Sequence, residues 1–398
     1  MLFRALLRPW GRDALLGAGL LVCVTTLLLY PTQAAQAGRE GLALCGNGLL
    51  PSLFPFFVLA SLVVELGLAD CLGRLLSPLM LPLFRVPGAG AAAMVLGFIG
   101  GYPVGARTAV SLYESGLCSR TQTERLLAFC NNAGPAFLFG VVGVGVFSST
   151  RAAILLCLTH IAASLCVGLC FRFYKPDQPG GTSSLPPRIQ APQLAVVFPK
   201  CGKQAFRSVL DLSAFVIFFT VAVQLCRLTG LLPALAGGLR RMLALVGTDA
   251  PWAEPVLVGL MELSGGVLGL GESGQATLPL AAFLLGWAGV CVHCQVLSFL
   301  AGSGLSSRPY LLGKALHGTL SALFLHLLCR RFPTLLPEKT VLAAQVDAMA
   351  DLDPSALLTL STTIAALTWL AFFALALFAI WKNGGKRRKT MIQWGKEC

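Results

Sequence analysis

The chain has 398 residues and a formal net charge of +13; 56% of its residues are hydrophobic and only 12% are charged. A soluble globular protein carries about 25% charged residues, so this composition excludes an ordinary soluble domain and indicates a polytopic α-helical membrane protein. The basic residues lie mostly at the termini and between apolar runs, as the positive-inside rule describes. Because no basic patch carries interleaved aromatic residues, we expect no nucleic-acid partner.

The N-terminal unit, residues 1–40, is predicted to be a membrane span. An apolar run extends from Ala14 to Tyr30, and the arginines that precede it place the N-terminus in the cytosol. The tripeptide Ala35-Gln36-Ala37 resembles a signal-peptidase site. The apolar run is at the long end for a signal peptide, so we expect an uncleaved span. Cleavage is the alternative, and it would not change the orientation of the rest.

Residues 41–174 form the first of two predicted repeats. A span over Leu53–Leu68 is followed by Cys71–Phe84, whose prolines and arginine suit an interfacial helix on the cytosolic side. Ala89–Gly116 then reads as two half-length apolar helices joined at Gly100-Gly101-Tyr102-Pro103. Each half is too short to cross a bilayer, which predicts a re-entrant hairpin.

A second break in this repeat falls at Asn131–Pro135. Thr121 and Glu124 have the spacing of a capping box, and the helix that they begin runs to about Phe147. A span over Ala152–Phe173 closes the repeat. Helices break inside a membrane only where protein or a water-filled cavity surrounds the break, so both breaks are predicted to line a binding site.

Residues 175–204 are a basic linker rich in proline and glycine, which we place in the cytosol. Residues 205–332 form the second repeat. Its predicted elements are a span at Val209–Leu228, an interfacial helix at Leu231–Leu245, a broken segment at Pro255–Leu270, a hairpin arm at Ala276–Leu300 and a span at Tyr310–Cys329.

The C-terminal part is predicted to be an external loop at residues 333–354 and a last span with a basic cytosolic tail at residues 355–398. The expected fold is therefore all-α, with about eight transmembrane helices and two re-entrant helical hairpins. With both termini in the cytosol, the two repeats run in opposite senses, which is the inverted-repeat plan of secondary transporters.

Several motifs carry a family likeness. The run Gly101-Tyr102-Pro103-Val104-Gly105-Ala106-Arg107, then Glu124-Arg125-Leu126, then Asn131–Pro135, resembles the nucleoside-recognition "gate" domain of bacterial membrane proteins. Within that group, Pro55-Phe56-Phe57, Pro78-Leu79-Met80 and Val86-Pro87-Gly88 resemble the sporulation integral membrane protein family known as YlbJ or SpoVV, and Glu262-Leu263-Ser264-Gly265 resembles its second-half acidic motif.

The resemblance covers about Gly41 to Leu328 and implies a fold similar to concentrative nucleoside transporters. It also implies a role in endospore formation: moving dipicolinic acid from the mother cell across the outer forespore membrane. Two alternatives remain open at this point. One is a carrier of nucleosides or other metabolites with the same fold, and the other is a non-transporting membrane scaffold for spore assembly.

Dipicolinate is a planar aromatic dianion, so a site in the membrane must offer positive potential. A break at Gly100–Pro103 would start a helix at Val104, whose free N–H groups attract anions. Arg107, one turn later, is a candidate for bidentate pairing with a carboxylate; the alternative is a structural arginine. Tyr102 is a candidate to stack on the ring or, equally, to fill space between helices.

Glu262 lies within an apolar run, where an ionisable residue is costly and is a functional candidate by default. It is a candidate to bind a coupling proton or Na⁺, or to pair with Arg107; the alternative is a wet interfacial notch. Glu124 is a second coupling-ion candidate, although a capping role alone explains it. The predicted substrate-binding residues are Gly101, Tyr102, Pro103, Gly105, Arg107, Asn131, Asn132, Glu262, Ser264, Gly265, Gln275 and Gln295.

The residues predict no enzyme, no cofactor and no metal. Cys291-Val292-His293-Cys294 lacks a second ligand pair at the usual spacing of a metal site. The sequence contains neither Gly-x-Ser-x-Gly nor His-Glu-x-x-His. The expected partners are a small organic anion and the lipid bilayer. A homo-oligomer is compatible with the sequence, and the coupling ion is left open.

Overall fold

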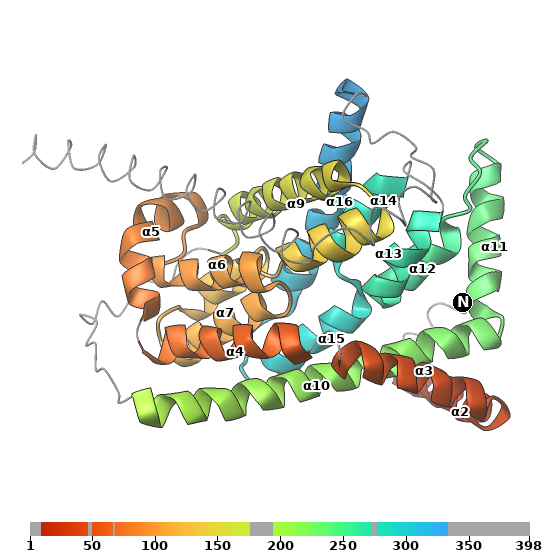
Figure 1. Cartoon of the computed structure of the whole chain (residues 1–398), viewed down its shortest axis with the longest axis horizontal. Coiled ribbons are helices and arrows are strands. Elements are labelled where there is room, and N and C mark those ends of the chain that lie inside the picture. Colours follow the sequence, from red (N-terminus) through yellow and green to blue (C-terminus); the bar gives the residue numbers. More distant parts are fainter. Residues whose placement is uncertain (1–8, 47–49, 67, 176–193, 273–276, 333–398) are drawn as a thin grey trace, which may run out of the picture.

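The computed structural model describes residues 9–46, 50–66, 68–175, 194–272 and 277–332 (Figure 1). Every regular element in these ranges is a helix. Four helices of the described part are long and apolar enough to cross a membrane, or six if each of two bent pairs counts as one span. The all-helical membrane fold is confirmed, whereas this number is below the expected eight. The loop and span predicted within residues 333–398 lie outside the described ranges.

The first half of the chain follows the predicted order of elements. Its helices are α2 (Pro9–Leu29), α3 (Pro31–Leu44), α4 (Leu50–Glu65), α5 (Leu68–Phe84), η2 (Gly88–Gly90), α6 (Ala91–Gly100), α7 (Val104–Glu114), α8 (Arg120–Leu127), the π-helix η3 (Ala136–Val146) and α9 (Thr150–Phe171). The two half-length helices α6 and α7 pack against each other, as expected for a hairpin broken at Gly101-Tyr102-Pro103. The Tyr102–Pro103 peptide bond is cis.

The second half of the chain begins with α10. Its helices are α10 (Leu194–Leu228), α11 (Leu231–Ala244), α12 (Ala253–Met261), α13 (Leu263–Glu272), α14 (Leu278–Trp287), α15 (Gly289–Leu300) and α16 (Arg308–Arg331). Helix α10 begins at Leu194, inside the segment assigned to the linker.

The hairpin arm predicted over Ala276–Leu300 is a candidate membrane span from Leu278 to Leu300, and it contains a break. The structure breaks it into α14 and α15 at Ala288, which has a φ of +77°, and Gly289, which has a φ of +81°. A Cβ atom on Gly289 would lie 3.1 Å from the carbonyl oxygen of Gly259 and 3.3 Å from the backbone nitrogen of Leu263. The break therefore lets α15 begin in close contact with the neighbouring break between α12 and α13.

The capping box of α8 also differs from the expected one. Ser119, not Thr121, is the N-cap; its hydroxyl accepts a hydrogen bond from the backbone N–H of Gln122, and the Gln122 side chain accepts one from the N–H of Ser119. The helix starts two residues earlier than the Thr121–Glu124 spacing requires, because Ser119 and Gln122 satisfy the same motif. The Glu124 carboxylate is thereby free for other partners.

The packing places α16 between the two halves. Figure 1 shows the long helix α10 along one side, with α5 and α11 at opposite ends of the molecule and running across its direction. Helix α16 packs against α9 from the first half and α14 from the second. Small residues bring α16 close to the end of α8 and to α14: a Cβ on Gly313 would lie 2.3 Å from the carbonyl oxygen of Ala128, and one on Gly286 would lie 2.5 Å from Cα of Gly318.

Candidate functional site

The two breaks of the first half lie against each other. A Cβ on Gly101, which has a φ of +78°, would come within 2.8 Å of the backbone nitrogen of Gly134. Gly97 on α6 and Gly105 on α7 hold the carbonyl group of Cys130 between them, since a Cβ on either would lie 1.9 or 2.0 Å from its oxygen. Glycine is required at these positions because no side chain fits. The packing brings the predicted break residues of both segments to one place.

A carboxylate caps the break between α12 and α13 in the second half. Glu262 ends α12, and its side chain accepts hydrogen bonds from the backbone N–H groups of Ser264 (2.9 Å) and Gly265 (2.7 Å) at the start of α13. A carboxylate at this position satisfies N–H groups that a helix start leaves without partners. Glu262 therefore does not form the expected pair with Arg107, and it stands within the group of breaks as a helix cap.

The centre of the molecule holds a buried lysine that the sequence argument missed. Tyr310, Lys314, His317 and Ser321 follow one face of α16, and all four are buried. The Lys314 ammonium donates to the carbonyl oxygen of Asn131 (2.9 Å) and lies 3.3 Å from Nδ1 of His317. Within the described residues, no Asp or Glu forms a salt bridge with Lys314. An ammonium that is 1% exposed and has no carboxylate beside it is the least compensated charge of this core.

Three histidines surround this lysine. Nε2 of His317 lies 3.0 Å from the carbonyl oxygen of His160, and the two rings are 4.3 Å apart. Nε2 of His160 accepts the backbone N–H of Ala133 at 3.0 Å. Nδ1 of His293 lies 3.0 Å from the Tyr310 hydroxyl. These contacts connect α9, α15 and α16 with the break before η3.

Unpartnered polar atoms gather around Lys314. Within the described part of the chain, the buried side-chain atoms without a hydrogen-bond partner include Tyr102 Oη, Asn131 Oδ1 and Nδ2, Asn132 Oδ1, His160 Nδ1, His293 Nε2 and Ser321 Oγ. Each buried polar atom without a partner costs about 1–3 kcal/mol. Their concentration beside one uncompensated cation indicates a site for a polar, anionic ligand.

The sequence-predicted residues divide into those near Lys314 and those elsewhere. Tyr102 is near, with Lys314 Nζ 5.9 Å from its ring centroid, and Asn131 and Asn132 are near as well. Buried Pro103 is the N-cap of α7. Arg107 lies with its guanidinium carbon 5.5 Å from the ring centroid of Phe299, and it has no ion pair among the described residues.

Two further predicted residues are Gln295 and Gln275. The Gln295 amide donates to Sγ of Cys291 at 3.4 Å. Gln275 lies outside the described residues. Lys314, His317, His160 and Tyr310 were not predicted. Lys314 carried a usable signal, because an ionisable residue in the apolar run Tyr310–Cys329 is a functional candidate for the same reason as Glu262.

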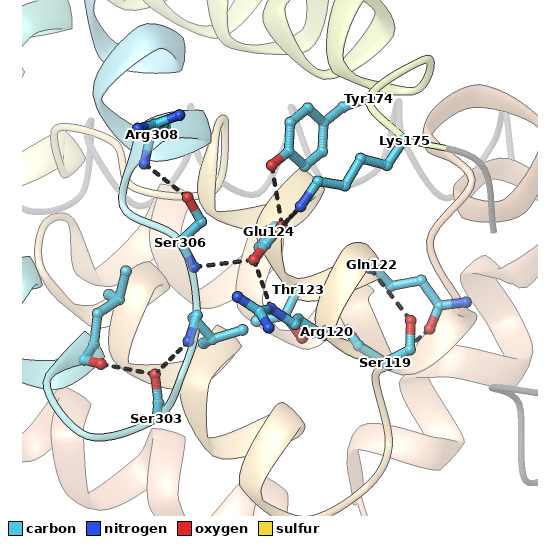
Figure 2. A network of polar contacts seen from close by, with 12 residues as sticks. Ser119, Arg120, Gln122, Thr123, Glu124, Tyr174, Lys175, Ser303, Ser306 and Arg308 are labelled. Carbon is cyan, nitrogen blue, oxygen red and sulfur yellow. Dashed lines mark hydrogen bonds and ion pairs between the residues drawn. The ribbon is translucent and has the colours of Figure 1, made fainter. Parts of the chain in front are cut away.

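Glu124 belongs to a different network, which Figure 2 shows. Oε1 of its carboxylate accepts from the Ser306 N–H (2.9 Å) and Arg120 Nε (3.0 Å), and Oε2 accepts from the Tyr174 hydroxyl (3.1 Å) and Lys175 Nζ (3.1 Å). Burial alone would raise the pKa of Glu124, but the four hydrogen bonds outweigh it and hold the pKa below its ordinary value. Glu124, a coupling-ion candidate, thus connects α8 with the end of α9 and with the loop before α16. Its network does not include Lys314.

Comparisons with known proteins agree with this architecture. The family model "Gate: Nucleoside recognition" matches residues 48–176. The sporulation integral membrane protein YlbJ of Bacillus subtilis (strain 168) is 30% identical over 336 residues, which are 79% of this chain and 82% of that protein. No solved structure matches the chain. Because the identity extends along most of both sequences, the chain belongs to the YlbJ family of sporulation integral membrane proteins.

Proposed function

We propose that this protein is a secondary transporter that carries a small organic anion, dipicolinic acid, from the mother cell across the outer forespore membrane. The observation that carries the proposal is the buried Lys314 ammonium, which has no carboxylate partner in the described structure and lies among unpartnered polar atoms at the helix breaks. Membership of a family of sporulation membrane proteins supports the role in sporulation, and the gate-domain match supports the role in transport.

The order of the helices supports a transporter with an inverted repeat. Each half has a first helix (α4 or α10), a crosswise helix (α5 or α11), a hairpin with a break (α6–α7 or α12–α13), a second broken helix (α8–η3 or α14–α15) and a closing helix (α9 or α16). The crosswise helices lie at opposite ends of the molecule (Figure 1). This arrangement fits two halves of opposite orientation around a central site, with both termini in the cytosol.

The proposed site supplies two cations to a dicarboxylate. Lys314 is the first, and Arg107, one turn into α7, is the second. At 4 Å and an effective dielectric constant of about 20, one ammonium attracts one carboxylate by about 4 kcal/mol. The rings of Tyr102 and the histidines offer flat surfaces to the aromatic ring of the substrate. Glu262, Ser264 and Gly265 contribute the side of the site that belongs to the second half.

Uptake of labelled dipicolinate by the purified full-length protein in liposomes tests this function. The wild type is expected to transport it, and Lys314→Met is expected to lower uptake at low substrate concentration roughly a hundredfold or more. The fold should survive, because methionine has a similar length and removes a buried charge that no carboxylate compensates. Lys203→Met, which removes an exposed lysine on α10, is the matched control. Absence of transport by the wild type would refute the proposal.

A nucleoside or another metabolite is the second candidate substrate, and the gate-domain description favours it. The unpartnered Asn131 amide and His293 ring would suit the hydrogen-bonding edges of a neutral base. Labelled nucleosides in the same liposomes separate the two. A neutral substrate would keep most of its transport in Lys314→Met, whereas a dianion would lose it.

A further inference from the structure

Lys314 and His317 form a pair in which one nitrogen, Nδ1 of His317, can still bind a proton. Nε2 of His317 faces the carbonyl oxygen of His160 at 3.0 Å. A carbonyl only accepts, so Nε2 carries the hydrogen of the neutral ring and Nδ1 has a free lone pair. That lone pair accepts from the Lys314 ammonium at 3.3 Å. The pair therefore holds a single positive charge, and a second proton on Nδ1 would place two cations side by side.

The groups around this pair add no strong acid to it. Tyr102 approaches from the α6–α7 break, Cys130 and the Asn131 carbonyl from the segment before η3, and His160 from α9. His160 is a neutral ring, because its Nε2 accepts the N–H of Ala133. Tyr310 and His293 bond to each other one turn away.

The charged side chains of the proposed substrate site are those of Lys314 on α16, Arg107 on α7 and Glu262 between α12 and α13. Two are positive and one is negative, so the site has a net charge of one positive unit. A dicarboxylate that binds there brings two negative charges and leaves the site with one negative unit in excess. A buried excess charge is costly, and one proton removes it.

We infer that the Lys314–His317 pair takes up one proton as the dicarboxylate binds and releases it as the dicarboxylate leaves, so that transport is coupled to protons. This inference rests on the proposed function and names its coupling ion. The proton comes from solution and binds Nδ1 of His317. The new N–H then donates to a substrate carboxylate, which also accepts from the Lys314 ammonium. On the other side of the membrane the anion and the proton leave together.

Liposomes that contain the purified protein and an internal pH-sensitive dye test the coupling, with the membrane potential clamped by potassium and valinomycin. Addition of dipicolinate outside should acidify the interior by about one proton for each molecule that enters. With one proton per substrate, an inward gradient of one pH unit supports a tenfold ratio of internal to external dipicolinate. Dipicolinate entry without proton movement would overturn the inference and leave the proposed function intact. Absence of dipicolinate transport would refute both.

His317→Asn separates proton binding from substrate binding. The Asn oxygen can accept from Lys314 in place of Nδ1, but it cannot hold a proton. The variant should lose the tenfold accumulation, and any dipicolinate that still enters should bring no proton with it. His326→Asn, which changes an exposed histidine of the same helix, should keep the accumulation. If His317→Asn still accumulates dipicolinate tenfold, the pair is not the proton site.

A measurement on the wild type alone covers the case in which the His317 variant does not fold. Calorimetric titration of the detergent-solubilised protein with dipicolinate measures the heat of binding. A comparison of two buffers of different ionisation enthalpy then gives the number of protons bound with each dipicolinate. The expected number is about one. A value of zero would overturn the inference whatever the variant does.

Discussion

The contact of Gly97 and Gly105 with the Cys130 carbonyl makes a sharp prediction for Gly97→Ala. The new methyl carbon would lie 1.9 Å from the Cys130 oxygen and 3.1 Å from Cα of Gly105. An ordinary carbon–oxygen contact is about 3.3 Å, so the backbone must move by about 1.4 Å. No flexible side chain can absorb this shift, because both neighbours are backbone atoms. Overpacking of this kind costs about 1–3 kcal/mol, and more where nothing yields.

The displacement should also reach the proposed substrate site. Cys130 directly precedes Asn131, whose carbonyl oxygen accepts from Lys314. We therefore expect Gly97→Ala to lower the Tm in detergent by roughly 5 °C and to reduce dipicolinate uptake at least about tenfold. Gly202→Ala on α10 is the control: nothing lies within 4 Å of its Cβ, and an alanine inside a helix should stabilise by about 0.5–1 kcal/mol. A Gly97→Ala protein with wild-type Tm and uptake would refute the packing argument.

Four further substitutions have defined outcomes. Glu124→Gln should cost about 1–2 kcal/mol, because its ionic partners are half-exposed and screened. Since the folded pKa of Glu124 is lowered, its stabilisation is present above the unfolded pKa and is lost as pH falls through the folded pKa; melting curves from pH 7 to 3 should show this loss in the wild type and a smaller one in the variant. Ser119→Ala should cost about 1 kcal/mol in the same melts, whereas Thr121→Ala should change stability by less than about 0.5 kcal/mol; equal effects would contradict the observed capping box. Arg107→Ala should lower dipicolinate uptake at least about tenfold, and unchanged uptake would remove Arg107 from the site.

Breaks that depend on local chemistry were predictable, and those imposed by packing were not. Gly100-Gly101-Tyr102-Pro103 contains two glycines and a proline, which have unusual backbone preferences, and the structure breaks the helix there. Ala288 carries no such signal. Its positive φ arises where Gly289 meets Gly259 and Leu263, which are distant in sequence. A break of this origin becomes visible only once the chain has folded.

The candidate site shows the same division. Asn131 and Asn132 stood out as polar residues in an apolar segment, and they lie near Lys314. The role of His160 depends on where α9 meets α16, and the sequence alone gives no such distance. The spacing of Thr121 and Glu124 predicts a capping role for Glu124, but Ser119 and Gln122 form the cap. The partners of Glu124 include Ser306 and Lys175, which are distant in sequence and could not be predicted from a local motif.

The position of Lys314 along α16 has a mechanical consequence. It lies directly after Gly313, which touches the end of α8, and four residues before Gly318, which touches α14. Lys314 thus lies between the two closest contacts of α16, and not at an end of the helix. A rocking motion about this point would open wide gaps at Ser306 or Arg331 while it moved the cation little. For the proposed transporter, this position would let access alternate between the two sides of the membrane while Lys314 stays in place.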